Sequence, residues 1–318
     1  MLGHEVTLRR LASLGPVLAL VVACLFFSAQ SPRFLTLGNV SLITQQVMVV
    51  GVLAIGQTLV ILTAGIDLSC GMLMALGGVT MTLLAGKAGM SAPVAIAAGI
   101  GATTFAGFLN GWLVTRVKLP PFIVTLGTMN IAFALTQIVS SSQTVTDLPQ
   151  LFTTLGTTVP LFGTRIAYGT VVMLLLYGLA WWLLRETAGG RHVYAVGNNR
   201  EASRLSGIDT ERLLLVVYTM AGALYGVASL LAVARTGVGD PQAGQTENLD
   251  TVTAVVLGGT SLFGGRGVIL GSLVGALIVG VFRNGLTLMG MSSVYQILVT
   301  GALVILAVAT DQWSRRHA

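Results

Sequence analysis

Few residues of this chain could perform catalysis. Its three histidines, His4, His192 and His317, all lie outside the long apolar segments. A serine protease that works inside a membrane needs a base beside its serine, and a zinc protease needs a pair of histidine ligands. Neither arrangement can be assembled here, and the two cysteines form no metal-ligand cluster. The sequence therefore predicts a protein that is neither an enzyme nor a metal-binding protein.

The stretch GGTSLFGGRG at 258–267 looks at first like a phosphate-binding loop. It lacks the Lys-Ser or Lys-Thr pair that should follow its last glycine, and it opens no soluble strand–helix unit. A break in a helix is the better interpretation, with Gly264 and Gly265 at the break. After the break, Gly267, Gly271 and Gly275 follow at four-residue spacing and are predicted to form one small-residue face of a helix, which suits helix packing. We therefore expect no ATP hydrolysis and no cofactor in this chain.

Asp67 is predicted to be the one acidic residue at apolar depth. In TAGIDLSCG it stands between Gly65 and Gly71, ahead of a helical segment. It could carry a proton, as carboxylates inside transporters do, or it could cap the next helix. We favour the cap, and we expect a break in the helix at Gly65, Asp67 and Gly71.

The composition of the chain is that of a membrane protein. Hydrophobic residues make up 54% of it and charged residues 9%, against about 25% charged residues in soluble domains. We predict an all-α polytopic bundle of about ten spans, each of about 17–25 residues, forming a single domain over residues 1–318. The first span could instead be a signal peptide that is removed. The spans are expected near 11–29, 45–64, 69–86, 92–115, 121–141, 166–184, 213–234, 250–264, 267–284 and 293–311.

Basic residues indicate the orientation of these spans. Ten spans put both termini on one side, and most of the 17 Lys and Arg fall there, which makes it the cytoplasmic side. This explains the net charge of +6 without nucleic acid binding. A cytoplasmic loop is expected at 185–212, and outer loops at 142–165 and 235–249 that either connect spans or receive an external partner. The inner residues are Arg9, Arg10, Arg116, Lys118, Arg185, Arg191, Arg200, Arg204, Arg212, Arg266, Arg315 and Arg316; the outer ones are Arg33, Lys87, Arg165, Arg235 and Arg283.

Two short motifs recur along the chain. GIDLSCG at 65–71 resembles GTSLFGG at 259–265, and GFLNG at 107–111 resembles GVFRNG at 280–285. Internal repeats are frequent in transporters. Because the predicted topology puts the two Asn-Gly pairs on opposite sides, either the repeat is inverted or one boundary is wrong.

The segment 185–212 carries nine charged residues between two apolar runs. Within it, NNREASRLSG predicts a short helix with Asn198 as its N-cap and Glu201 completing a capping box. Gly207 suits the left-handed position that ends such a helix. Two helical turns are not stable alone in water. The helix therefore needs a surface to pack against, either the membrane or another protein.

EASRLSG at 201–207 has the spacing of the Glu-Ala-Ala-x-x-x-Gly loop of ABC importer permeases, with Ser203 at the second alanine. AGIDLSCG, PPFIVTLGT, GRHVYAVGNNREASRLSGI and LDTVTAVVLGGTSLFGGRGVILGSLVGALI extend the likeness. From about residue 35 to 311 the chain resembles the ribose-type sugar permease family. It departs from that family at Ala64, where glycine is usual, and at Cys70, where valine is common.

The resemblance implies a set of partners in the bacterial cytoplasmic membrane. These are a second permease copy or paralogue, separate ATPase subunits that hold ATP and magnesium, an extracytoplasmic solute-binding protein, and membrane lipid. Coupling to the ATPase is assigned by resemblance to Asn198, Asn199, Arg200, Glu201, Ala202, Ser203, Arg204, Leu205 and Gly207.

A pathway for neutral, hydroxylated sugars calls for uncharged hydrogen-bonding groups. The candidates are Gln45, Gln46, Gln57, Asn110, Asn130, Gln137, Asn284 and Gln296. For each of them, a hydrogen bond between helices is the competing role. A secondary transporter or channel that works without an ATPase stays an alternative, and the sequence does not name the sugar or decide between homodimer and heterodimer.

Overall fold

The computed structural model describes residues 2–161 and 163–316, without the side chains of residues 2–14, 307, 310, 311 and 313–316. His317 and the side chains of His4, Arg9, Arg10, Arg315 and Arg316 lie outside this described part. The long helices are α1 (Leu2–Gln30), α2 (Leu37–Leu62), α3 (Cys70–Gly86), α4 (Ala92–Thr115), α5 (Pro121–Ser140), α7 (Tyr168–Glu186), α10 (Thr210–Thr236), α12 (Ile269–Leu288) and α13 (Ser293–Arg316). Shorter elements are α6 (Gln150–Thr153), η1 (Thr154–Gly156), β1 (Thr158–Leu161), β2 (Thr164–Ala167), α8 (Ala188–Asn198), α9 (Arg200–Leu205) and α11 (Glu247–Leu257).

The described residues form an all-α membrane bundle with one small hairpin. Six helices, α2, α4, α5, α7, α10 and α12, are long and apolar enough to cross a membrane. The apolar parts of α1, α3 and α13 are shorter. The predicted span at 250–264 is wrong, because α11 ends at Leu257 and a loop follows. In this loop Gly259, Gly264 and Gly265 all have positive φ, which ends regular helix.

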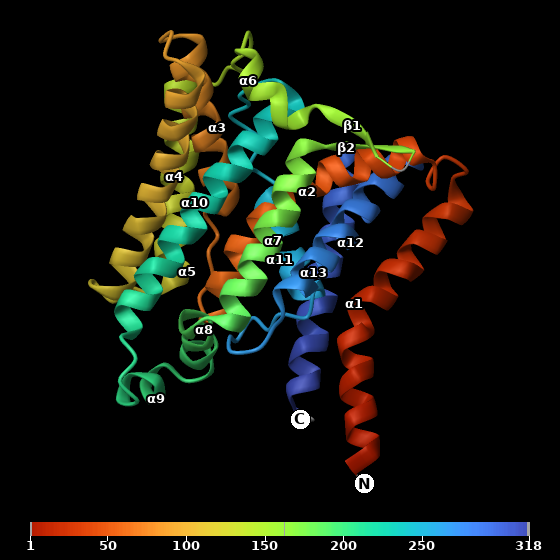
Figure 1. Ribbon diagram of the computed structural model, residues 1–318, viewed down its shortest axis with the longest axis vertical. Coiled ribbons are helices and arrows are strands. Elements are labelled where there is room, and N and C mark those ends of the chain that lie inside the picture. The colour runs from red at the N-terminus through yellow and green to blue at the C-terminus, as the bar shows by residue number, and fades with distance from the viewer. Residues whose placement is uncertain (1, 162, 317–318) are drawn as a thin grey trace.

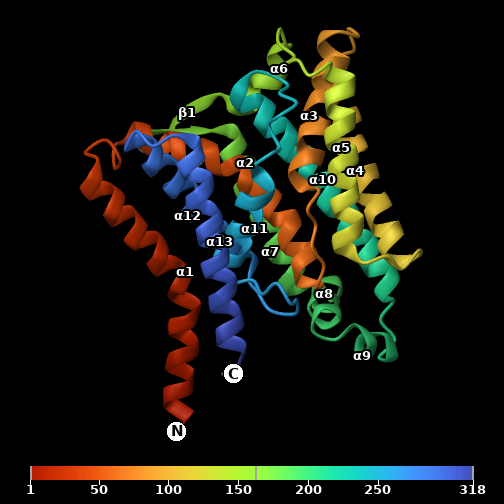
Figure 2. The same ribbon diagram turned by 180° about the vertical axis from the view of Figure 1, so that it is seen from behind.

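The two ends of the bundle differ. Both termini lie at one end together with α8 and α9 (Figure 1), and we call this the terminal end. The opposite end, which we call the hairpin end, carries α6, β1 and β2, as Figure 2 also shows. The two strands pair antiparallel with Thr158 opposite Ala167. They lie at the C-terminal end of the predicted outer loop 142–165, where the sequence does not predict strands.

The chain contains an inverted repeat. α2 runs from the hairpin end to the terminal end, and α10 runs the opposite way (Figure 1). α3 packs on α4 and α5 as α11 packs on α12 and α13, and α10 contacts α4 as α2 contacts α12. Asn110 on α4 and Asn284 on α12 therefore belong to equivalent helices of opposite direction. This confirms the inverted reading of the Asn-Gly pairs.

Two helices of the repeat, α3 and α11, are preceded by irregular segments rather than by tight turns. Segment 63–69 leads from the terminal end to α3, and segment 237–246 leads from the hairpin end to α11. The first turn of α3, which follows segment 63–69, meets segment 237–246 at Gly71, where a Cβ would lie 2.4 Å from the Gly244 carbonyl oxygen. The equivalent of GIDLSCG is thus the segment before α11, not GTSLFGG. The predicted outer loop 235–249 turns back into the bundle.

Glycines set the closest helix contacts. A Cβ on Gly107 of α4 would lie 2.4 Å from the Tyr218 carbonyl oxygen of α10, and one on Gly222 would lie 2.4 Å from the Thr103 carbonyl oxygen. Gly275 of α12 packs in the same way on the backbone of α11 at Ala254. Gly271 and Gly275 therefore form the predicted packing face of α12, which allows backbones to approach closely in a membrane. Gly267 is not part of that face, because it precedes the first residue of the helix, Ile269.

We expect Gly107→Ala to destabilise the bundle by about 1–3 kcal/mol, because the new methyl group meets backbone that cannot rotate away. Gly101→Ala on the same helix is the matched control, since a Cβ there meets nothing within 4 Å. The measurement is the thermal unfolding midpoint in detergent micelles. Equal midpoints for the two variants would contradict close α4–α10 packing.

Candidate functional site

The terminal end carries the helix pair α8–α9, which contains the predicted docking residues. The predicted N-cap is wrong: Asn198 is the last residue of α8, and Asn199 caps α9 by accepting a hydrogen bond from the Ala202 N–H at 2.9 Å. The reason is that Asn199 has the extended backbone (φ −157°) that an N-cap needs. Glu201 does not complete a capping box and instead pairs with Arg204 at 2.6 Å.

The outer surface of α9 is exposed among the residues that the structure describes. The side chains of Glu201 and Arg204 are 66% and 61% exposed, and Leu205 is 74% exposed. The hydrogen bond from Arg204 lowers the pKa of the Glu201 carboxyl, which therefore stays ionised near neutral pH. Gly207 has φ +88°, the left-handed conformation that the sequence predicts, and it turns the chain toward α10. A charged surface with an exposed leucine thus faces away from the bundle.

The predicted helix-break glycines meet the docking segment at what we call the glycine junction, formed by Leu62, Ala64, Gly197, Gly264 and Gly265. The Gly265 N–H donates to the Leu62 carbonyl oxygen at 3.0 Å. A Cβ on Gly197 would lie 1.7 Å from that same oxygen, and one on Gly264 would lie 2.7 Å from Ala64. The end of α8 therefore bears on the end of α2 and on the loop after α11 without intervening side chains.

Asp67 lies in a buried polar network between α2, α3 and α10. Its Oδ1 accepts hydrogen bonds from the Ser69 N–H at 2.8 Å and the Ser69 hydroxyl at 2.5 Å, and its Oδ2 accepts one from Tyr225 at 3.2 Å. Asn110 on α4 donates to the Ser69 hydroxyl at 3.2 Å. Gln57 completes the network with its Oε1 3.4 Å from the Tyr225 hydroxyl.

The predicted cap by Asp67 is also wrong in detail. Ser69 is the N-cap of α3, so Asp67 lies two residues before the cap position and does not reach the first turn. The Gly71 N–H of that turn instead donates to Asn248 Oδ1 of α11 at 2.6 Å. Asp67 is not the only buried acid among the described residues, since Asp250 on α11 is 5% exposed. The returning segment 237–246, which the sequence assigns to a surface loop, brings Asp250 inside.

Most of the predicted pathway amides bond to other parts of the protein. Asn284 exchanges two hydrogen bonds of 2.9 Å with Asn39, and Gln137 donates to the Pro241 carbonyl oxygen. Asn130 bonds only within its own helix, at Leu126, among the described residues. Three further amides also form hydrogen bonds: Gln45 donates to Ser41, Asn110 accepts from Thr128, and Gln296 donates to Thr287 and to the Met291 carbonyl oxygen. By contrast, the Oε1 of Gln46 and the Nε2 of Gln57 are buried without a hydrogen-bond partner among the described residues.

A polar cavity of about 320 Å³ lies near the hairpin end, between α2, α3, α10, α11 and α12. We call it the hairpin-end cavity. Its polar lining includes Arg235, Asp240, Gln242, Gln245, Thr246, Glu247 and Arg283, and none of the predicted pathway amides lines it. The sequence missed this site because its charged residues come from segments that look like outer loop or loop edge. Only the return of 237–246 gathers them.

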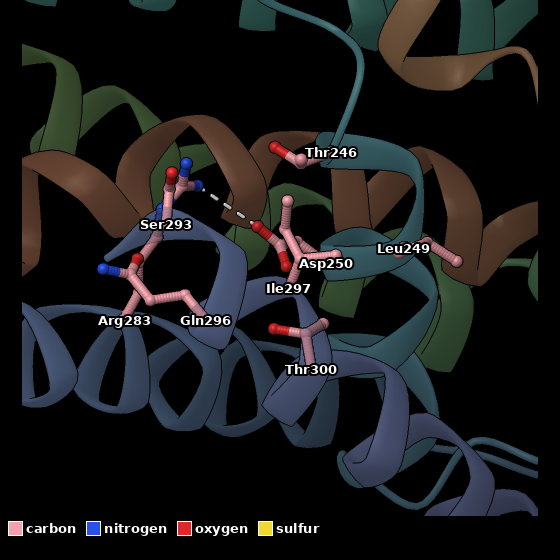
Figure 3. A pocket seen from close by; sticks show the side chains of 8 residues that line it. All are labelled: Thr246, Leu249, Asp250, Arg283, Ser293, Gln296, Ile297 and Thr300. Atoms are coloured by element: carbon pink, nitrogen blue, oxygen red, sulfur yellow. Dashed lines mark hydrogen bonds and ion pairs between the residues drawn. The ribbon is translucent and has the colours of Figure 1, made fainter. Parts of the chain in front are cut away.

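A smaller pocket of about 60 Å³ shares Thr246 and Arg283 with the hairpin-end cavity (Figure 3). In it Arg283 Nη1 lies 3.2 Å from Asp250 Oδ2, which ties α12 to α11. Gln296 and Thr300 of α13 also line this pocket. Among the described residues, no group of three or more His, Cys, Asp or Glu side chains could hold a metal ion.

Apolar helices arranged as an inverted repeat, with a charged helix pair at one end, define a multi-pass membrane transport protein. The chain belongs to the family described as branched-chain amino acid transport system / permease component, which matches residues 39–308. It is a transmembrane permease subunit of an ABC importer in the inner membrane, a transport component and not an enzyme.

Curated relatives match almost the whole chain. The fructose import permease protein of Rhizobium meliloti is 43% identical over 312 residues, which cover 95% of this chain and 86% of the relative. The ribose import permease protein of Escherichia coli strain K12 is 39% identical, covering 93% and 92%. That of Bacillus subtilis strain 168 is 38% identical, covering 94% and 92%. No solved structure matches the chain.

Asp67→Ala is expected to destabilise the protein by about 2–6 kcal/mol, because it leaves two buried donors, the N–H and the hydroxyl of Ser69, without their acceptor at about 1–3 kcal/mol each. Asp67→Asn keeps an acceptor toward Ser69 and should cost less than half as much. The measurement is the unfolding midpoint in detergent, together with uptake. A normally folded Asp67→Asn protein without uptake would show that the carboxylate carries protons.

Gly197→Ala should disrupt the glycine junction, since its methyl group overlaps the Leu62 carbonyl oxygen. We expect ATP-dependent uptake by the reconstituted importer to fall by about tenfold or more, as strained core substitutions cost about 1–3 kcal/mol. Gly189→Ala in the same helix is the control, because its Cβ would have an ordinary contact of 3.7 Å with Thr187. Equal uptake by both variants would show that the junction transmits nothing.

Proposed function

We propose that this chain forms the translocation pathway of an importer for a monosaccharide or a similar small polar solute. The names of the relatives, which are import permeases for fructose and ribose, support this substrate class. Buried uncharged polar groups around Asp67 and the polar hairpin-end cavity suit a hydroxylated solute. The observation that carries the proposal is the exposed helix pair α8–α9, in which the C-terminal backbone of α8 packs at the glycine junction.

The helix pair α8–α9 is the proposed docking element for a separate ATPase, which would hold ATP and magnesium. Its exposed charges and Leu205 need a partner surface, and α9 alone is too short to be stable. Closure of the ATPase subunits would push α8 against α2 and the loop after α11. Such a push would rock the two halves of the inverted repeat, which is how alternating access is commonly achieved.

The remaining partners follow from the same proposal. A solute-binding protein would deliver its cargo at the hairpin end, and a second permease copy or paralogue would complete the membrane assembly. Broad apolar faces are available for that copy or for lipid, for example at Ile131 and Ile138 of α5, which are 61% and 72% exposed.

The terminal end is proposed to be cytoplasmic, with both termini inside. Arg116, Arg191, Arg212 and Arg266 belong to or directly follow segments at that end, as the positive-inside rule requires. If segments 63–69 and 237–246 each complete a crossing together with α3 and α11, the chain crosses the membrane about ten times.

The test is reconstitution of the chain in vesicles with its ATPase and binding protein. We expect uptake of D-ribose or D-fructose that requires ATP, and Glu201→Arg should lower both uptake and ATPase association by about tenfold or more. Glu186→Arg is the control, because Glu186 is also an exposed acid, paired with Arg185, but lies outside the helix pair. ATP-independent uptake would identify a secondary transporter or channel instead.

A further inference from the structure

We propose that the hairpin-end cavity is the site in this chain that receives the solute, and that the solute is recognised there as a neutral polyhydroxylated molecule. This inference rests on the proposed function and adds the location and the chemistry of recognition. The cavity of about 320 Å³ falls at the lower end of the range for small-molecule sites, which is about 300–1,000 Å³. It therefore suits a single sugar unit better than a long chain.

Charges of both signs surround the cavity. Arg235 and Arg283 line it together with Asp240 and Glu247, and Asp250 beside the lining pairs with Arg283, so a ligand meets strong donors and strong acceptors with no large excess of either charge. A site for an anion or a cation would carry an excess of the opposite charge. Hydroxyl groups both donate and accept, and hydrogen bonds to charged groups are stronger than those between neutral groups. This lining therefore differs from the uncharged one that the sequence analysis expects for a sugar pathway.

Arg235 is the residue most available to a ligand. Arg283 is held by Asp250 at 3.2 Å, and Gln245 donates to Gln242 at 3.0 Å. In contrast, Arg235 makes no ion pair or side-chain hydrogen bond with any other described residue. A guanidinium presents five N–H donors in a planar fork, which matches adjacent hydroxyl oxygens of a polyol.

The floor of the cavity is closed. Gly244 and Gly71 meet below it, where a Cβ on Gly244 would lie 2.1 Å from the Gly71 carbonyl oxygen. Asn248 locks this contact by accepting from the Gly71 N–H. Beyond it lies the Asp67 network, which is the next polar region on the way to the glycine junction. A solute entering from the hairpin end would stop at this contact until α3 and α11 separate.

The experiment compares Arg235→Gln with Arg165→Gln, an exposed arginine of β2 at the same end whose side chain bonds to Thr158. Each variant is reconstituted with ATPase and binding protein. Uptake of D-ribose, D-fructose, D-allose and D-xylose is measured together with the affinity of the binding protein for the permease. We expect Arg235→Gln to lower kcat/KM for the transported sugar by about tenfold or more, with docking affinity unchanged, and Arg165→Gln to behave as wild type.

Gln245→Ala provides a second, exposed substitution in the lining if Arg235→Gln fails to fold, and the same loss of uptake is expected. Wild-type uptake rates in both cavity variants would overturn the inference. A parallel loss of docking affinity would also overturn it, by showing that these side chains hold the binding protein instead of the solute. If the wild-type importer takes up none of the four sugars, the proposed substrate class fails, which is a separate result.

Discussion

The contact between Gly71 and Gly244 is the constraint on which the rest of the structure depends. Inside a bilayer every backbone N–H and C=O must find a partner, so a helix can begin at depth only where protein groups satisfy its first turn. Asn248 does this for α3 by accepting from the Gly71 N–H at 2.6 Å. The close approach needs two residues without side chains, since a Cβ on either would overlap the other's carbonyl oxygen. The two interrupted segments are thereby fixed to each other.

This contact separates two regions with different chemistry. On the hairpin side, residues of both charges from α10, α11, α12 and segment 237–246 surround a cavity. On the terminal side, Asp67, Tyr225 and Gln57 form a buried network that reaches toward the glycine junction. Because the repeat is inverted, each half contributes one interrupted segment, and relative motion of the halves would open one region as it closes the other.

In the proposed mechanism, motion passes from α8–α9 to the interrupted segments through backbone contact. At the glycine junction Gly197 and Gly265 meet the Leu62 carbonyl oxygen directly. Side chains would absorb a displacement by changing rotamer, whereas packed backbone moves as a unit. Ala64 at this junction adopts a left-handed backbone with φ 61°. The ribose-type sugar permeases, which the sequence resembles, usually have glycine at this position. The strain is modest for a residue with a single methyl group.

The sequence by itself determined the membrane class, nearly all the helices, the charged segment between two apolar runs and the turn at Gly207, because apolar length, charge clustering and glycine conformation are local properties. It misplaced the caps by one or two residues, since neighbouring asparagines or an Asx-turn offer equal local hydrogen bonds. Only the tertiary structure decided that segment 237–246 returns into the bundle as irregular chain. As a result, α11 by itself is too short to span a membrane. It also decided that Arg235, Glu247 and Arg283 share one cavity. Those facts depend on contacts between residues far apart in the chain, as between Gly71 and Gly244, and no local pattern encodes them.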